Sequence, residues 1–484
     1  MANYAVAVEQ TIPFIYDPVE QELIIIASCA LCVAAELNVK FVTEVTINND
    51  NIIGNFKTTP NNAGVGVIDI SHIIKNYVSA DNIAGTRSTF KANGANDKPF
   101  SMHLIDQYST NTNTCKRVST KTKVEFTDAS GTTQETSFRL SSWFYALNGY
   151  VKNKDSLSWV NDIRHIYGDG FGYDTTNFLL KSGTLRKFLS NSPQTQWARL
   201  EDYGTMALIP RHLEYDAEGV STTIDDLKYI HVIQYPEYDG QGTALANTYI
   251  IKSAANGAFD TGGNNLSDNK NDLLYFGVFP ANLLWSDSFN TQKNIMKSYT
   301  VSAVDNSLEI MSETKTVNIL CPNLKGYNPI RLAWLNQWGT WDYFTFNQKS
   351  IKSISTKGST YKQLGGTWNA KSYNPYGYKG GNKTFRVNAT EKISMNTDYL
   401  TEEHSGWFEE LINSPEIYIL KDWELPRKVL TPSVNGEPTA LLTQYSTPCT
   451  LKTTSFTKKT IANDKLVQYT IEVEKSKTLR TQAI

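Results

Sequence analysis

The most constraining feature of the sequence is its densest aromatic cluster, in residues 331–346. Six of its sixteen side chains are aromatic: Trp334, Trp338, Trp341, Tyr343, Phe344 and Phe346. Strand-like runs at 331–335 and 341–346 flank a turn, in which Asn336 and Gly339 tolerate a left-handed backbone. The pattern predicts a β-hairpin. Its aromatic side chains must be buried on both faces, against the same domain, a second domain or another subunit.

The side chains predicted to pack or to form an interface are mostly tryptophans of this hairpin. Tryptophan and tyrosine are enriched at protein contacts, because they combine a large apolar surface with a polar group. A further tryptophan lies on the apolar face of a helix predicted downstream. We therefore expect packing or interface roles for Trp334, Trp338, Trp341, Tyr343, Phe346 and Trp407.

The composition favours a mainly β protein with weakly charged surfaces. Of the residues, 40% are apolar and 12% aromatic, whereas only 19% are charged, below the roughly 25% of average soluble domains. A length of 484 residues exceeds one ordinary core, so we expect several domains. The net charge of −2 gives no electrostatic reason to expect nucleic acid or a membrane as a partner, and it permits protein–protein association.

The order of predicted elements divides the chain into three domains. Residues 1–140 are predicted to form an N-terminal β-sandwich with a short helix, and residues 141–330 a second β-sandwich with insertions. Residues 331–484 are predicted to form a C-terminal α+β domain that the aromatic hairpin opens. The expected fold is therefore mainly β, with two β-sandwich-like domains followed by an α+β domain.

Alternating β-branched and aromatic residues predict the strands of the first domain. These strands lie at 39–47, 52–57, 100–108 and 121–127, the last with a partner that extends through residue 139. Asp69 or Ser71 can cap a short helix between them. One face of that helix is predicted to carry Ile70, Ile73, Ile74 and Tyr77.

The second and third domains show the same kind of pattern with longer polar separators. Strands of the second domain are predicted at 176–180, 205–209, 229–235, 248–252, 273–279, 298–304 and 317–321. A helical turn is predicted at 184–189. The third domain continues with a tyrosine-rich loop, a helix and two further strands, at 364–381, 398–412, 416–420 and 466–474. Pro415 ends the helix, because proline cannot continue it.

The cysteines and the N-terminus bear on the compartment. Five scattered cysteines do not form a disulfide framework. Cys29 and Cys32 match the C-x-x-C spacing of a redox pair or half a zinc site, but they sit in an apolar run with no second pair nearby, so we expect plain core packing. Residues 1–10 lack a basic leader, and the apolar run 23–35 is too short to span a membrane. We expect synthesis and assembly in a cytoplasm.

No constellation of residues typical of catalysis or metal binding is present, so we expect no catalytic, cofactor or metal site. The six histidines are dispersed, and no P-loop or nucleophile elbow occurs. The glycine-rich residues 168–172 and the acidic residues near 239 favour ordinary loops. The adjacent carboxylates Asp225-Asp226 and Glu402-Glu403 do not demonstrate a hydrolytic pair, and Glu402-Glu403 suits the start of a helix.

A second aromatic segment lies in the tyrosine-rich loop, where glycines surround Trp368, Tyr373, Tyr376 and Tyr378. Three interpretations suit it. The side chains can anchor a protein interface, pack within the domain, or form a stacking platform for a glycan. We favour contact with a protein partner and keep glycan contact as an alternative.

Several motifs, in order, resemble structural proteins of tailed bacteriophages. They are residues 40–47 with 66–74, the hairpin 331–346, residues 406–418 and residues 463–473, with a weaker match at 203–205. The resemblance implies a non-enzymatic virion component of a tail, neck or baseplate. It also implies a symmetric oligomer, with copies of itself and other virion structural proteins as partners, assembled in the host cytoplasm.

The alternatives belong to different functional classes. A tail-tip or surface module would bind glycan through the tyrosine-rich loop, and a head-neck or capsid-associated protein would occupy another place in the particle. A polysaccharide-degrading enzyme would depend on single carboxylates such as Asp225 or Glu402.

Overall fold

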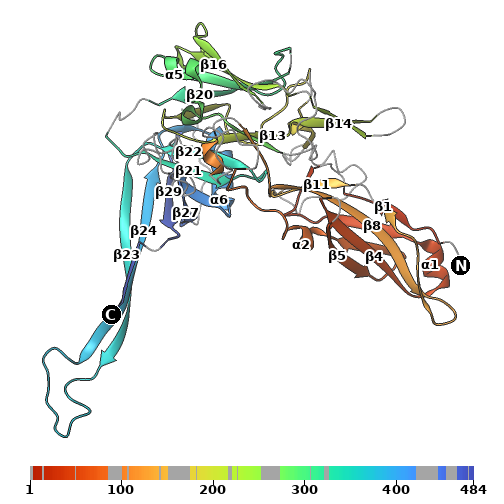
Figure 1. Cartoon of the computed structure of the whole chain (residues 1–484), viewed down its shortest axis with the longest axis horizontal. Coiled ribbons are helices and arrows are strands. Elements are labelled where there is room, and N and C mark those ends of the chain that lie inside the picture. The colour runs from red at the N-terminus through yellow and green to blue at the C-terminus, as the bar shows by residue number, and fades with distance from the viewer. Residues whose placement is uncertain are drawn as a thin grey trace, which may run out of the picture.

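Strands dominate the computed structural model, which confirms the prediction of a mainly β protein. The structure describes residues 4–12, 16–48, 51–84, 101–105, 108–140, 143–150, 175–180, 183–215, 221–225, 227–251, 273–305, 307–320, 326–420, 445–453, 466–477 and 479–483. Three bodies of sheet meet in a centre from which a long hairpin projects (Figure 1). Among the described residues, no helix is both long and apolar enough to cross a membrane.

The N-terminal part packs a large sheet on a small one. The large sheet runs in the order β2 (Tyr16–Pro18), β11 (Phe144–Leu147), β8 (Cys115–Thr127), β4 (Leu37–Ile47) and β5 (Asn51–Thr58), with β9 (Thr133–Glu135) and β10 (Arg139–Leu140) also on β8. The small sheet has the order β1 (Ala7–Gln10), β3 (Ile24–Ser28), β6 (Val65–Asp69). Both sheets contribute to one buried cluster. They approach closely at Gly66, where a Cβ would lie 2.5 Å from the ring of Phe41.

Two short helices complete this part and correct two expectations. Helix α2 (Ser71–Ile74) follows β6 as predicted and buries Ile74, but Tyr77 is 44% exposed, because the helix ends before it. Helix α1 (Ala30–Ala35) begins beside Cys29, which forms a disulfide with Cys32. The expectation of plain packing cysteines is therefore wrong about their bonding, although both residues are buried in the cluster.

The middle part is built on a five-stranded sheet. Its order is β12 (Thr195–Ala198), β20 (Lys315–Ile319), β19 (Ser298–Val304), β16 (Tyr229–Tyr235) and β17 (Ala246–Ile251). Smaller sheets are β13 (Thr205–Leu208) with β18 (Leu274–Gly277) and β7 (Tyr108–Thr110), and β14 (Arg211–Tyr215) with β15 (Ser221–Asp225). The helical elements are η1 (Met102–Leu104), η3 (Thr175–Phe178), η4 (Tyr238–Gly240), α4 (Pro280–Leu283) and α5 (Asp287–Gln292).

The C-terminal part is an eight-stranded sheet with one helix. Its order is β22 (Trp341–Phe346), β21 (Ile330–Leu335), β26 (Ile417–Leu420), β27 (Ser446–Leu451), β29 (Thr470–Lys475), β24 (Gly381–Asn396) and β23 (Ser350–Gln363), and β30 (Arg480–Ala483) pairs with β24. A two-stranded pair consists of β25 (Leu400–Thr401) and β28 (Leu466–Val467). Helix α6 (Glu403–Asn413) covers the inner strands, with Trp407, Phe408 and Leu411 buried.

Most of the predicted strands are present, and the exceptions have local causes. The aromatic hairpin forms as expected, as β21 and β22 in antiparallel register. Segments 100–108 and 176–180 contain the 3₁₀ helices η1 and η3 where strands were predicted. Residues 184–189 form no helical turn. The predicted helix 398–412 begins only at Glu403, because β25 occupies Leu400 and Thr401.

The proposed domain boundaries at 140 and 330 stay predictions. The largest buried cluster draws on all three predicted segments, for example through Tyr108, Phe276 and Tyr343. Strand β7, from the first predicted segment, pairs with β18 from the second. The parts are therefore joined by a continuous core at the centre of the molecule.

Candidate functional site

The β21–β22 hairpin is a partition between two hydrophobic clusters. Alternate side chains of a strand point to opposite faces, and Leu332 and Trp334 contribute to the C-terminal cluster beneath α6. Ala333 and Leu335, one residue further along, contribute to the central cluster with Trp341 of the paired strand. A hairpin that has no solvent face must be apolar on both sides, which explains its aromatic content.

Each predicted packing residue is buried against the same chain. Trp334 lies against Trp407 with the ring centroids 4.9 Å apart, and Trp338 lies against Phe178 at 4.2 Å. All are at most 3% exposed: Trp334, Trp338, Trp341, Tyr343, Phe346 and Trp407. Their burial therefore needs no second subunit, and a role for them in contacts between subunits stays a prediction.

A buried ion pair connects the hairpin to the middle part. The guanidinium of Arg331 lies 3.5 Å from Asp202 Oδ2, and both side chains are fully buried. Arg331 also donates to the carbonyl of Tyr203 and to Thr345 Oγ1, at 2.7 and 2.8 Å. Burial alone would raise the pKa of Asp202, but the charges of Arg331 and Arg199 outweigh it and hold that pKa below its usual value. The carboxylate is therefore charged and paired.

A histidine from the N-terminal segment lies beside the same strand. The hydroxyl of Tyr343 lies 2.8 Å from His103 Nδ1 and 2.9 Å from Thr205 Oγ1. Burial, with a smaller contribution from the nearby Arg331 charge, lowers the pKa of His103 to about 3. His103 is therefore neutral at physiological pH. The Tyr343 hydroxyl links it to Thr205, so residues of all three predicted segments meet in this hydrogen-bonded group.

Polar contacts fix α6 and the turn of the hairpin. Asp342 accepts hydrogen bonds from Trp407 Nε1 at 2.6 Å and from Ser190 Oγ at 2.7 Å. Burial raises the pKa of this carboxyl. In the turn, Gly339 has φ +76°, and a Cβ there would lie 2.1 Å from the carbonyl oxygen of Asn148. These buried bonds set one geometry for the centre.

The second aromatic segment has the opposite environment. The four side chains at the tip of the β23–β24 hairpin are exposed: Trp368 (65%), Tyr373 (58%), Tyr376 (39%) and Tyr378 (70%). They pack only on one another, since the Tyr376 and Tyr378 rings stack at 5.6 Å and Trp368 meets Tyr373 edge-on at 5.9 Å. The Lys379 ammonium lies 5.4 Å from the Tyr376 ring centre. Packing within a domain core is therefore wrong for these four residues.

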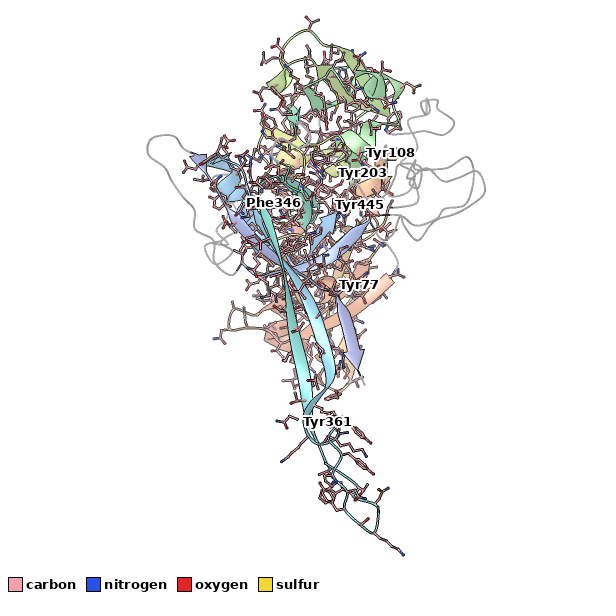
Figure 2. All side chains as sticks on the ribbon, turned by 90° about the vertical axis from the view of Figure 1, so that its left-hand side faces the viewer. Tyr77, Tyr108, Tyr203, Phe346, Tyr361 and Tyr445 are labelled. Carbon is pink, nitrogen blue, oxygen red and sulfur yellow. A yellow bond between two sulfur atoms is a disulfide. The ribbon has the colours of Figure 1, made fainter. Side chains whose placement is uncertain are left out.

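We call residues 347–390 the arm segment; it contains β23, the tip and most of β24. Strand β23 is the last strand of its sheet, and among the described residues no strand pairs with its outer edge. Further large apolar side chains are exposed along the arm segment: Ile351, Ile354, Tyr361, Leu364 and Phe385. Figure 2 shows Phe346 in the body of the molecule and Tyr361 near the far end of the arm.

Neither a protein-family model nor a curated protein matches the sequence.

The residues considered for catalysis are not brought together. Asp225 ends the β14–β15 hairpin opposite Arg211, and Glu402 and Glu403 stand at the exposed start of α6. Among the described residues, no group of three or more histidine, cysteine or acidic side chains could hold a metal ion. Asp226 and residues 168–172 lie outside the described residues. The predicted loop near residue 239 contains η4.

Two functional features were not predicted. A charged residue within an apolar strand is a signal that Arg331 must have a buried partner, but nothing local to Asp202 identifies it as that partner. The arm strands were also missed. Strand β23 is exposed along nearly its whole length, and β24 buries one face only from Ala389 onward. The outer parts of both strands therefore lack the alternation of apolar and polar residues that identifies strands.

Proposed function

We propose that the chain is a non-enzymatic structural component of a tailed-phage particle, located in the tail or baseplate. It would act through contacts with copies of itself and with other virion proteins. The observation that carries this proposal is the pairing of a rigid, densely bonded centre with a long, exposed arm. The resemblance of the sequence motifs to tailed-phage structural proteins supports the same conclusion.

The centre suits a mechanical role. The Arg331–Asp202 pair joins the β21–β22 hairpin to the middle part, and the Trp407–Asp342 bond holds α6 on the same hairpin. A buried network of this kind resists deformation, because separating its members leaves polar groups without partners in a low-dielectric interior.

The arm suits assembly. A two-stranded hairpin without a core is marginally stable in water, and an unpaired edge strand is a template for association. The arm segment combines such an edge with exposed aromatic side chains such as Trp368 and Tyr378. A partner that covers the arm would stabilise it and would connect rigid bodies at a fixed spacing.

Immunogold electron microscopy tests the location. Antibody raised against this protein is applied to particles from the source culture. Gold at the tail or its distal end is the expected result. Gold on the capsid would keep a virion role and contradict the tail assignment, and particles without gold would contradict the virion role.

Glycan binding by the tip is the second candidate, favoured by one observation. The stacked Tyr376–Tyr378 pair and the exposed Trp368 present flat aromatic faces to solvent, as sugar-binding platforms do. Glycan-array binding by the full chain, lost in Trp368→Ala with Tyr378→Ala, would establish it. Absence of binding by the wild-type chain would reject it.

A further inference from the structure

Charge is strongly segregated along this nearly neutral chain. The arm segment contains eight of the 46 basic residues and none of the 48 acidic residues. The rest of the chain therefore has 38 basic against 48 acidic residues. Residues 393–420, which begin near the end of β24, contain six acidic residues and no lysine or arginine. His404 in that segment adds no charge at neutral pH, because burial lowers its pKa to about 4.

Three of the eight arm cations lie along one face. In the β23–β24 register, Ser359 pairs with Arg386, Tyr361 with Lys383 and Lys357 with Asn388. Paired residues and alternate positions of a strand share a face, so Lys357, Lys383 and Arg386 lie along the same face as Tyr361. None of the ion pairs among the described residues involves these three cations. The face is a basic strip with an aromatic side chain in it.

The rest of the same chain does not neutralise the basic strip. A strand of 14 residues, the length of β23, extends about 45 Å. The arm points away from α6 and the central sheets (Figure 1). Charges separated by more than about 10 Å of water are largely screened. The acidic groups of the body are therefore too far away to neutralise the strip.

The acidic counterpart lies at the start of α6. Glu402 and Glu403 are exposed, Asp398 is partly exposed, and Tyr399 beside them is 65% exposed. No ion pair among the described residues uses these three carboxylates. We call the surface formed by Asp398, Tyr399, Glu402 and Glu403 the α6 acidic end. Like the basic strip, it combines charged side chains with an exposed aromatic side chain.

We infer that the arm segment of one copy docks on the α6 acidic end of a second copy. Pairing of two arms would bring like charges together, whereas arm against acidic end joins opposite charges. The contact is heterologous, so repetition of it closes a ring or extends a filament. This inference rests on the proposed function in one respect, since it names the partner in the assembly that the proposal requires.

A charge-swap experiment on the full chain tests the inference. The arm variant carries Lys357→Glu, Lys383→Glu and Arg386→Glu. The body variant carries Asp398→Lys, Glu402→Lys and Glu403→Lys. A control with the same change in net charge as the arm variant carries Lys187→Glu, Lys293→Glu and Lys297→Glu in the middle part. Mass photometry measures the assembly of each at low salt, and circular dichroism confirms that each is folded.

Wild type and control are expected to assemble, and assembly is expected to weaken at high salt. The arm variant and the body variant alone are expected to remain monomeric. Mixing them is expected to restore assembly, because each then offers the charge that the other lacks. A merely structural defect would not be rescued by mixing.

Three outcomes would overturn the inference. Assembly of the arm variant alone would show that the strip is not the contact. Failure of the mixture would show that the α6 acidic end is not the acceptor. Arm-dependent retention on heparin or single-stranded DNA, with assembly intact, would assign the strip to a polyanion instead. In each case the proposed virion role survives if gold labels the tail, so the two failures are distinguishable.

Discussion

Two consecutive hairpins of this chain are rich in aromatic residues and have opposite environments. In β21–β22 the aromatic side chains separate two hydrophobic clusters, and Trp334 and Trp338 are fully buried. In β23–β24 they stand exposed at the end of a projecting arm. The two hairpins differ in how their charges are paired. The first hairpin has one cation, Arg331, which lies against buried Asp202, whereas the second has several lysines and no acidic residue in the arm segment.

The comparison shows that an aromatic cluster indicates a need for burial but not where burial occurs. The first hairpin is satisfied within its own chain. The second stays exposed in the chain, and its cations exclude a position inside an apolar core.

The largest effect is expected from removing the tryptophans that the first hairpin places in the central cluster. Trp338→Ala and Trp341→Ala should each reduce the free energy of unfolding by about 3–5 kcal/mol, and the double variant should fail to fold or to assemble. Trp341→Ala also removes the hydrogen bond that the Trp341 indole N–H donates to the carbonyl of Asp81. Urea denaturation measures the single variants. A double variant that folds and assembles normally would show that these tryptophans of the hairpin are not required for folding or assembly.

Breaking the buried ion pair comes next. Asp202→Asn leaves Arg331 charged and buried without its counter-ion, which should cost about 3–5 kcal/mol. Thermal and urea unfolding measure the loss. Lys57→Gln is the matched control, since Lys57 pairs with Glu125 at the surface with its side chain 52% exposed, and it should cost less than about 1 kcal/mol. Equal losses in the two variants would contradict the importance of burial.

The buried histidine predicts a dependence of stability on pH. The pKa of His103 falls from 6.5 to about 3 on folding, so below about pH 6.5 the unfolded chain binds a proton that the folded chain does not. Stability from this group is therefore full above pH 6.5 and is lost as the pH falls, by up to about 1.4 kcal/mol per unit. His103→Gln should flatten the curve between pH 6.5 and 4. Parallel curves for variant and wild type would be inconsistent with a buried neutral histidine.

The smallest effect on stability is expected at the arm tip. Trp368→Ala and Tyr378→Ala should change the free energy of unfolding by less than about 0.5 kcal/mol, because both side chains are largely exposed. The same denaturation assay compares them with Trp338→Ala. A loss of more than about 2 kcal/mol in the free energy of unfolding would show that the tip side chains are packed in a core. The two hairpins would then not differ in their environments.

Local pattern predicted much of the fold and less of the site. Strand β16, which has one buried face, was predicted at its true bounds, because its apolar and polar residues alternate in the sequence. Strand β19 was also predicted at its true bounds, although it is buried on both faces. Segments where tertiary contacts prevail were not, as at η1, where His103 is held by residues far along the chain.

The contacts of the candidate site join residues that are far apart in the sequence, so local patterns did not predict them. The aromatic content of residues 331–346 predicted burial, but the choice of Asp202 as the partner of Arg331 is made by the fold, 129 residues away in sequence. The basic character of the arm was hidden by the overall charge of −2, because a sum over the chain cancels segregated charges.

The central claim is that the arm is uncovered in the free chain and covered in the assembly. Hydrogen–deuterium exchange of the full chain, measured as monomer and as assembled protein, tests it most directly. We predict slow exchange in β21–β22 in both states, and fast exchange in β23 and the tip that becomes slow only on assembly. Unchanged fast exchange of the arm in the assembled protein would contradict the claim.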